Sequence, residues 1–462
     1  MEAEVLVEQA PLKKASKDKV GAWRMFAWQS RALSISGNVL ILGFLSIYCT
    51  DTLKIPAALV GTLLMATKLL DGITNLLAGV IVDRTNTKIG RARPYELSII
   101  GVWLCTWLMF ACPPEFSMAA KAVWVFSMFI FVDSIFSTLL NASNTVYMVR
   151  AFSKQEHYIA ISSYGSIIVF LGAIAINVSF PMLMAKMATS PGGWKTLIAI
   201  YAVPFLLIGL LRFFFIKETN NVDTVSGEKV NFKELMSVLK TNRYIYTIAI
   251  MLFVFNFVTN MGVGVYYFTY IVKNVGLMGP LALTQVVILP LVFLFPMIIR
   301  KFSTTKLIIA GIFITILGYV VNFIAVDNFP LLALGGILTG AGTVPIAMLS
   351  ALMIIDCADY NEWQGRPRAE GTLGSVTGFT SKIGAAIGSG VMGVLLSMSG
   401  YTGNAATQPE SADFMIRMLF SIIPLVLYIL VALTLKFYKL DKLVPQIRKE
   451  NEERRNQMGL TK

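Results

Sequence analysis

The stretch KETNNVDTVSGEKVNFKELMSVLKTNR, residues 217–243, is the longest polar interruption between apolar segments of this chain. On both sides of it the sequence consists of long apolar segments joined by short polar ones. A helix needs about 20 apolar residues to cross the hydrocarbon core of a bilayer. Segments of that length predict transmembrane helices at 32–50, 56–82, 95–112, 119–149, 158–184, 196–216, 244–272, 281–299, 306–326, 330–357, 371–399 and 414–438.

The polar stretch has six of these predicted helices on each side. Two six-helix halves resemble the organisation of the major facilitator superfamily, whose halves are parallel repeats. The layout therefore predicts an all-α membrane protein with 12 transmembrane helices in two six-helix halves. The boundaries predict an N-terminal arm at 1–31, a first half at 32–216, a linker at 217–243, a second half at 244–438 and a tail at 439–462.

The composition excludes a soluble globular protein. Of the 462 residues, 56% are hydrophobic and 14% are charged, whereas a soluble domain carries about 25% charged residues. Lys and Arg concentrate on alternate loops, as the positive-inside rule describes. This asymmetry predicts a multi-pass protein of the inner (plasma) membrane with both termini in the cytoplasm. It also accounts for the formal net charge of +13 without a nucleic-acid partner.

Enzymatic and metal-binding motifs are absent from the sequence. There is no HExxH, no nucleophile elbow and no Walker loop, so we expect neither an enzyme nor a self-contained ATP-driven pump. The four cysteines form no CxxC pair, and buried cysteines usually act as small hydrophobes. We therefore expect no disulfide, no metal site and no cofactor beyond a transported ion.

Two motifs carry a resemblance to a known family. The first is Asp71-Gly-Ile-Thr-Asn75, followed by Gly79-Val-Ile-Val-Asp83 and by Gly90-Arg-Ala-Arg-Pro94. The second runs from Ile355 to Trp363 and continues in Arg368-Ala-Glu-Gly371. Composition alone would allow a plain basic loop for the first. The spacing of both resembles the melibiose permease family, the glycoside–pentoside–hexuronide:cation symporters.

This resemblance implies a secondary active transporter that carries a sugar or glycoside with a monovalent cation. It implies that Asp71 is a cation-site carboxylate and that Lys382 communicates with it. It also implies gating loops, whose charged residues are Asp83, Arg84, Arg91, Arg93, Asp356, Asp359 and Glu362. We expect a monomer.

Four ionisable residues fall inside predicted helices, namely Lys68, Asp71, Asp133 and Lys382. Each costs at least about 2.5–3.5 kcal/mol near the bilayer centre, which marks them as functional candidates. Lys68, Asp71 and Asn75 share one helix face, so a self-neutralising Lys68–Asp71 pair is the alternative to a functional site. The predicted cation-coupling residues are Asp71, Asn75, Thr74, Lys382 and Lys68.

The helix at 56–82 departs from the family at one position. Asn75 stands where relatives commonly carry a second carboxylate, and an amide can carry neither a proton nor a charge. A single acid favours H⁺ over Na⁺ as the coupling ion, since a Na⁺ site usually collects several oxygen ligands.

Amides and aromatic residues inside apolar helices predict the substrate site. Sugars bind such mixtures because aromatic faces pack on C–H surfaces while amides both donate and accept hydrogen bonds. Asp133 fits either a substrate contact or an interhelical hydrogen bond. The family's charges on the first and fifth helices are missing, so a nucleoside or drug, with or without cation coupling, is the alternative substrate. The predicted substrate residues are Asn38, Asp133, Asn141, Tyr164, Asn256, Asn260 and Tyr267.

Overall fold

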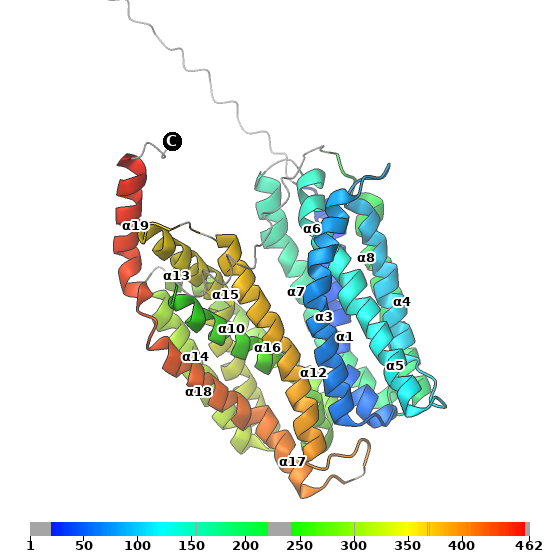
Figure 1. The fold of residues 1–462 in the computed structure, drawn as a ribbon. Coiled ribbons are helices and arrows are strands. Elements are labelled where there is room, and N and C mark those ends of the chain that lie inside the picture. Colours follow the sequence, from blue (N-terminus) through cyan, green and yellow to red (C-terminus); the bar gives the residue numbers. More distant parts are fainter. Residues whose placement is uncertain are drawn as a thin grey trace, which may run out of the picture.

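The computed structural model describes residues 20–152, 155–219, 242–299, 301–366, 368, 370–405 and 407–457, apart from some side chains within helices. Most of the predicted linker, residues 220–241, lies outside these ranges. The described chain is helical, and Figure 1 shows the helices in two bundles that lean together at one end.

The first half contains six long helical units, several of which change between α, π and 3-10 geometry along their length. They are α1 (Ala22–Leu42) with α2 (Leu45–Ile47) and η1 (Tyr48–Thr52), α3 (Ala57–Arg84), η2 (Arg93–Leu97) with α4 (Ser98–Phe110), α5 (Met118–Phe129) with η3 (Ile130–Ser137) and α6 (Thr138–Ala151), α7 (Gln155–Met187), and α8 (Pro191–Phe215).

The second half repeats this arrangement and adds a terminal helix. Its units are α10 (Tyr244–Asn260) with α11 (Gly264–Tyr266) and η4 (Tyr267–Ile271), η5 (Val275–Leu277) with α12 (Met278–Thr284), η6 (Gln285–Ile288) and α13 (Leu289–Ile299), α14 (Thr304–Ala325), α15 (Phe329–Trp363), α16 (Glu370–Met398), α17 (Glu410–Arg417) with η7 (Met418–Ile422) and α18 (Ile423–Leu435), and α19 (Leu440–Gln457).

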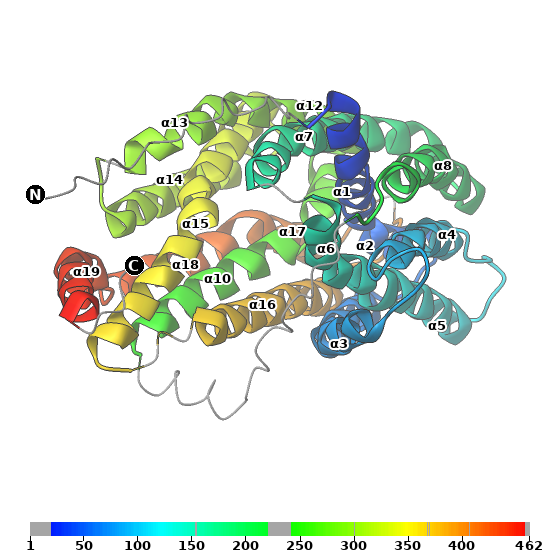
Figure 2. The ribbon, with the colours of Figure 1, turned by 90° about the horizontal axis from the view of Figure 1, so that it is seen from above.

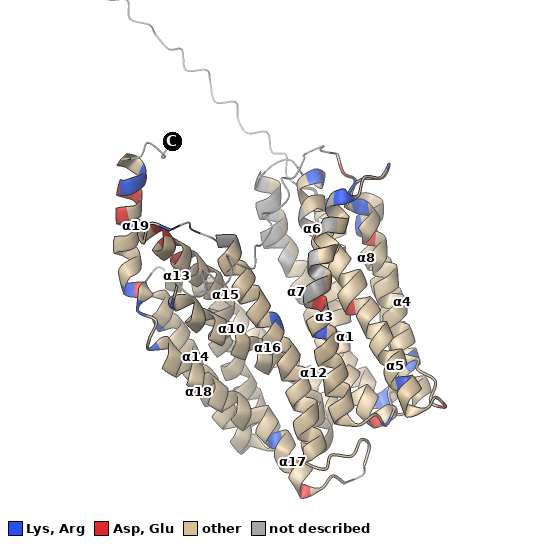
Figure 3. Ribbon diagram, viewed as in Figure 1, with Lys and Arg blue, Asp and Glu red and all other residues tan. Residues whose placement is uncertain are grey.

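Ten of the described helical units are long and apolar enough to cross a membrane. The other two expected spans are α3 and the pair η2–α4, so the units occupy the twelve predicted positions. Figure 3 shows that charged residues lie mainly near the two ends of the apolar body. The chain is therefore an all-α membrane protein with two six-helix halves.

Many helix boundaries differ from the predicted ones by a few residues, and three departures are larger. The first helix begins at Ala22 rather than at 32, because Arg31 is buried within the bundle beside Glu96 and need not stay outside it. The expected helix at 244–272 is broken at Gly262, whose φ of +67° suits a residue without Cβ. The tail contains the helix α19, which packs on α15.

The two halves share a core at one end only. One hydrophobic cluster contains residues of both halves, including Tyr48, Tyr266 and Leu396. Two further clusters stay within a single half, one around Trp28 and the other around Met353. We call the shared end the junction end and the opposite end, which bears the start of α1 and α19, the basic end (Figure 1). The core thus joins the two halves at the junction end, while each half keeps a core of its own toward the basic end.

The helix α16 provides much of the contact between the halves. An added Cβ at Gly384 or Gly388 would clash with the backbone of α10, and one at Gly390 or Gly393 would clash with α3. The GxxxG pattern at 384–388 is thus a packing surface, as expected of small residues in membranes. Figure 2 shows α16 beside α3, and α12 beside α7 on the other flank.

Candidate cation-coupling and solute site

An ion pair joins the two halves between the junction end and the basic end. Lys382 of α16 places its Nζ 3.0 Å from Oδ2 of Asp71 on α3. The hydroxyl of Thr138 donates to the other carboxylate oxygen of Asp71 at 2.8 Å. The side chains of Lys382 and Asp71 are 40% and 23% exposed, so solvent and ions reach the pair. The structure thus brings together Asp71 and Lys382, two of the five residues that the sequence predicts for coupling.

A second contact between the halves lies one helical turn away. Lys68 of α3 donates to Oδ1 of Asn260 on α10 at 2.7 Å. Asn260 in turn donates to the backbone oxygen of Asn256 at 2.9 Å. Lys68 therefore reaches across to the second half in this state.

Asp133 completes a group of four charged side chains. It lies on the π-helical segment η3, close enough to Lys68, Asp71 and Lys382 to interact electrostatically with all three. Thr138 links the two acids, because its hydroxyl contacts Asp71 and also the Asp133 backbone oxygen at 3.1 Å. Two carboxylates and two ammonium groups sum to zero, so one added cation leaves the group with a single positive charge.

The remaining predicted substrate residues divide into two sets. Asn141 is exposed on α6, which continues the unit of Asp133, and Asn256 is partly exposed on α10, which carries the Lys68 partner Asn260. Asn38 is buried and donates to Thr106 at 2.7 Å. Tyr267 is buried against Phe420 and donates to the Val326 backbone oxygen. The last two serve packing in this state. The side chains of Asn75, Tyr164 and Asp83 lie outside the described part of the chain, while Thr74 donates to the backbone of its own helix.

A buried charge network inside the first half was missed by the sequence analysis. Glu96 is fully buried and its Oε1 lies 3.5 Å from both Arg31 and Arg212. The Arg212 guanidinium also stacks 3.4 Å above the ring of Trp28. Arg31 is not among the predicted intramembrane charges because the predicted helix begins one residue after it. Arg212 is not among them because it lies near a predicted helix end. The network ties three of the six units together.

The loop after α3 is held by a residue from the start of the linker. The carboxylate of Glu218 accepts hydrogen bonds from the backbone N–H groups of Arg91, Ala92 and Arg93 at 2.8–3.0 Å. The Arg93 side chain donates to the Phe213 backbone oxygen, whereas Arg84 is exposed. This predicted gating loop is thus fixed to the first half in the present state.

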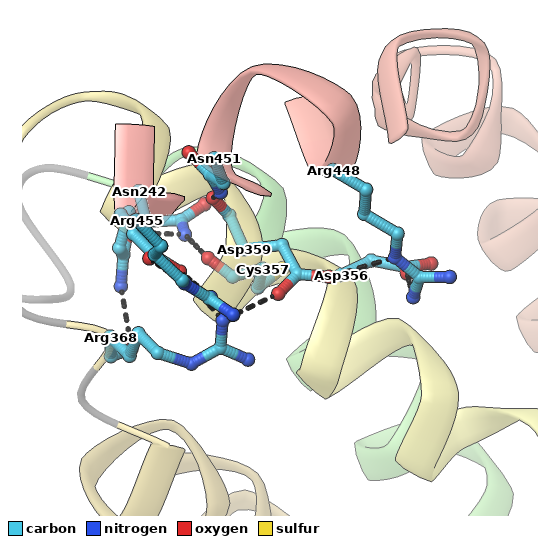
Figure 4. Close-up of polar contacts among 10 residues, drawn as sticks. Asn242, Asp356, Cys357, Asp359, Arg368, Arg448, Asn451 and Arg455 are labelled. Carbon is cyan, nitrogen blue, oxygen red and sulfur yellow. Dashed lines mark hydrogen bonds and ion pairs between the residues drawn. The ribbon is translucent and has the colours of Figure 1, made fainter. Parts of the chain in front are cut away.

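The second predicted gating segment is covered by α19. Arg448 bridges Asp356 and Asp359, each at 2.9 Å. Glu362 pairs with Arg455 and, at 2.7 Å, with Arg368. Figure 4 shows Arg448 and Arg455 extending from α19 toward the end of α15. Trp363 donates to Glu450 at 2.6 Å, which lowers the pKa of that carboxyl. The terminal helix therefore neutralises the acidic end of α15.

The junction end has its own polar cluster, which the sequence analysis also missed. Asp51 accepts hydrogen bonds from Tyr270 and Tyr401, both in the second half. Lys54 donates to the Gly403 backbone oxygen at 2.8 Å. One carboxylate thus binds two hydroxyls across the interface between the halves. Such bonds are stronger than neutral ones because the acceptor is ionised.

Comparison with known proteins names the family. A family model described as MFS/sugar transport protein matches residues 31–442. The chain belongs to this family of transporters. The match spans both halves, so the resemblance inferred from the two motifs is confirmed.

Relatives of this sugar transport family member extend over most of its length. The isoprimeverose transporter of Lactiplantibacillus pentosus is 29% identical over 442 residues, covering 90% of this chain and 88% of that protein. A putative glycoside/cation symporter of Escherichia coli strain K12 is 26% identical over 416 residues, covering 86% and 87%. A solved mutant of a nucleoside transporter shares the fold with a TM-score of 0.65 and 12% identity, over 90% of this chain and 98% of that one. That last similarity concerns the fold alone.

Proposed function

We propose that this protein is a secondary active transporter that carries a sugar or glycoside together with a monovalent cation, H⁺ rather than Na⁺. The proposal rests first on family membership and on relatives named as sugar and glycoside transporters. The observation that carries the coupling is the Lys382–Asp71 pair between the halves. The free energy of a cation gradient can drive sugar uptake only if the same conformational change depends on the binding of both the cation and the sugar.

In the mechanism that we infer, Lys382 substitutes for the cation when the site is empty. Opposite unit charges about 4 Å apart attract by about 4 kcal/mol at an effective dielectric constant of about 20. Solvent access to both side chains reduces this value. A proton or cation at Asp71 displaces Lys382, releases α16 from α3 and so changes the relative stability of the two orientations of the halves.

The solute, in this proposal, binds beside the charged group, between the parted halves. Asn141, Asn256 and Asn260 offer donors and acceptors, and Asp133 offers a second acceptor. The moving bodies are the proposed first half at 32–216 and second half at 244–438, joined by the linker at 217–243 between the arm at 1–31 and the tail at 439–462. A single chain supplies every residue that this mechanism uses.

We expect Asn260→Ala to weaken solute binding, because the substitution removes an amide of the site and the acceptor of Lys68. Removing one hydrogen-bonding partner of a bound solute costs about 1–3 kcal/mol, so the apparent affinity should fall about ten-fold. Asn256→Ala should have a smaller effect. Counterflow of labelled sugars measures both, with the exposed Asn274→Ala as control. Unchanged affinity in both variants would exclude the α10 part of the site.

The gating loops complete the cycle in this proposal. The basic end carries cations on the first half, at Arg84, Arg91 and Arg93, and carboxylates on the second half at the end of α15. In the present state α19 and Arg368 neutralise those carboxylates. When the halves close at the basic end, the two sets of opposite charge can meet directly.

The proposed topology places the basic end and both termini in the cytoplasm of the inner membrane, as the Lys/Arg distribution suggests. A cysteine at Asn86, an exposed position of the basic end, should then escape an impermeant maleimide in intact cells and react after permeabilisation. A cysteine at Glu115, exposed between α4 and α5, should react in intact cells. The reverse pattern would invert the topology.

A further inference from the structure

A cavity of about 310 Å³ lies within the second half, apart from the charged group. Its walls include Thr259, Gly262, Gln285, Asn322 and Thr339, which come from α10, its break, η6, α14 and α15. Asn260 points elsewhere and reaches Lys68 of the first half. The volume is within the range of small-molecule sites, about 300–1,000 Å³.

The cavity wall contains two amide side chains, those of Asn322 and Gln285. Asn322 is 5% exposed, and its Oδ1 lies against Gly335, where an added Cβ would come within 2.0 Å of it. Gln285 extends toward α15 on the other side, where a Cβ added at Gly336 would lie 3.1 Å from its Nε2. Two amides and a tyrosine, Tyr319, therefore stand around the same space.

The backbone around the cavity is irregular on two sides. The helix α10 ends at Asn260, and Gly262 adopts a φ of +67° before α11 begins. Gln285 opens the 3-10 segment η6 in the middle of its helical unit. Within the membrane, non-helical backbone persists only where it is buried in protein or lines a polar cavity. A site at broken helices is also where transporters commonly bind small solutes.

We propose that this cavity is a second binding site, which takes an uncharged polyhydroxylated molecule of the size of one sugar ring. Its lining, as far as the described residues form it, contains amides, hydroxyls and apolar side chains but no charged residue. Hydroxyl groups of a neutral sugar can form hydrogen bonds with the polar side chains of this lining, whereas the carboxylate of a sugar acid finds no cation among these residues. The choice of a sugar rests on the proposed function; the existence of the site does not.

The site lies next to a contact between the halves but does not share its residues. Thr259 and Met261 line the cavity, whereas Asn260 between them contacts Lys68.

Thiol protection tests the proposal. The full-length protein with Thr339→Cys is treated with iodoacetamide, an uncharged reagent, and alkylation of Cys-containing peptides is followed by mass spectrometry. Methyl β-D-glucopyranoside and D-xylose are the neutral probes, and D-glucuronate is the charged one. A ligand at ten times its dissociation constant should slow alkylation about ten-fold. Thr343→Cys, one turn along α15 and outside the lining, is the control.

The proposal expects a neutral sugar to protect the thiol at position 339, but not that at 343, while glucuronate protects neither. Protection should persist in Asp71→Asn and disappear when Gly336→Leu fills the cavity or Asn322→Val removes its amide. The proposal is wrong if the thiol at position 339 is alkylated equally fast with and without every neutral sugar, as expected of a cavity that holds water only. It is also wrong if glucuronate protects this thiol equally well, or if Asp71→Asn removes the protection. If neutral sugars protect but no sugar shows counterflow, the second site stands and the proposed transport function fails.

Discussion

Asp71→Asn is expected to abolish uphill sugar accumulation in proteoliposomes while leaving exchange of sugar down its gradient at least partly intact. The asparagine keeps the size of the side chain and an acceptor for Thr138, but it can neither bind a proton nor attract Lys382. The conformational change then no longer depends on the cation. Accumulation should fall to the equilibrium ratio of one, measured as the internal against the external concentration of labelled sugar.

Lys382→Gln gives the complementary variant. Removing the ammonium leaves Asp71 ionised without its partner from α16, so the empty transporter should lose its internal counter-ion and leak the cation without sugar. The double variant Asp71→Asn/Lys382→Gln should express better than either single variant because no unpaired charge remains. If Asp71→Asn still concentrates its sugar, Asp71 is a structural charge and coupling occurs elsewhere.

Asp51→Ala is expected to open the junction end. The carboxylate of Asp51 holds Tyr270 and Tyr401 across the interface, and a hydrogen bond to a charged group contributes about 1.5–3 kcal/mol. Losing both bonds should shift the equilibrium away from the present state by about 3 kcal/mol, which is more than 100-fold. Cys49, a buried native thiol of the same core, reports the change through its rate of alkylation.

The matched control for this variant is Glu115→Ala, which removes an exposed carboxylate between α4 and α5. Its Cys49 should react as slowly as that of the unmodified protein, whereas Asp51→Ala should accelerate the reaction at least ten-fold. Tyr401→Phe should give an intermediate rate because Tyr270 still donates. Equal rates in Asp51→Ala and the unmodified protein would show that packing, rather than this cluster, closes the junction end.

The sequence predicted the fold well because apolar length decides it. Segments of membrane-spanning length and one polar stretch at 217–243 define two six-helix halves, and all twelve predicted spans have a counterpart in the structure. The predicted first helix starts at 32, whereas α1 starts at Ala22 and includes the buried Arg31. Hydropathy cannot show that Glu96, from elsewhere in the first half, pairs with Arg31 and with a second arginine, Arg212.

The candidate site was partly predictable for the same reason. Charges inside apolar helices are conspicuous, so Lys68, Asp71, Asp133 and Lys382 stood out individually. Their pairing was open, since partners on different helices leave no local pattern. The Asp51 cluster and the contacts of α19 were missed because their residues lie at helix ends or in the tail, where polar residues are expected. Asn38 and Tyr267 show the opposite failure: they fit a sugar site by type but are used in packing.

The central claim, that sugar and cation move together, is tested most directly by sugar-induced ion movement. Proteoliposomes that contain a fluorescent pH indicator are mixed with a sugar in the absence of any imposed gradient. If sugar and protons enter together, the lumen acidifies in the unmodified protein, and it does not in Asp71→Asn. Acidification in Na⁺-free buffer identifies H⁺ as the coupling ion. Sugar entry that moves no protons and does not depend on a Na⁺ gradient would contradict the account.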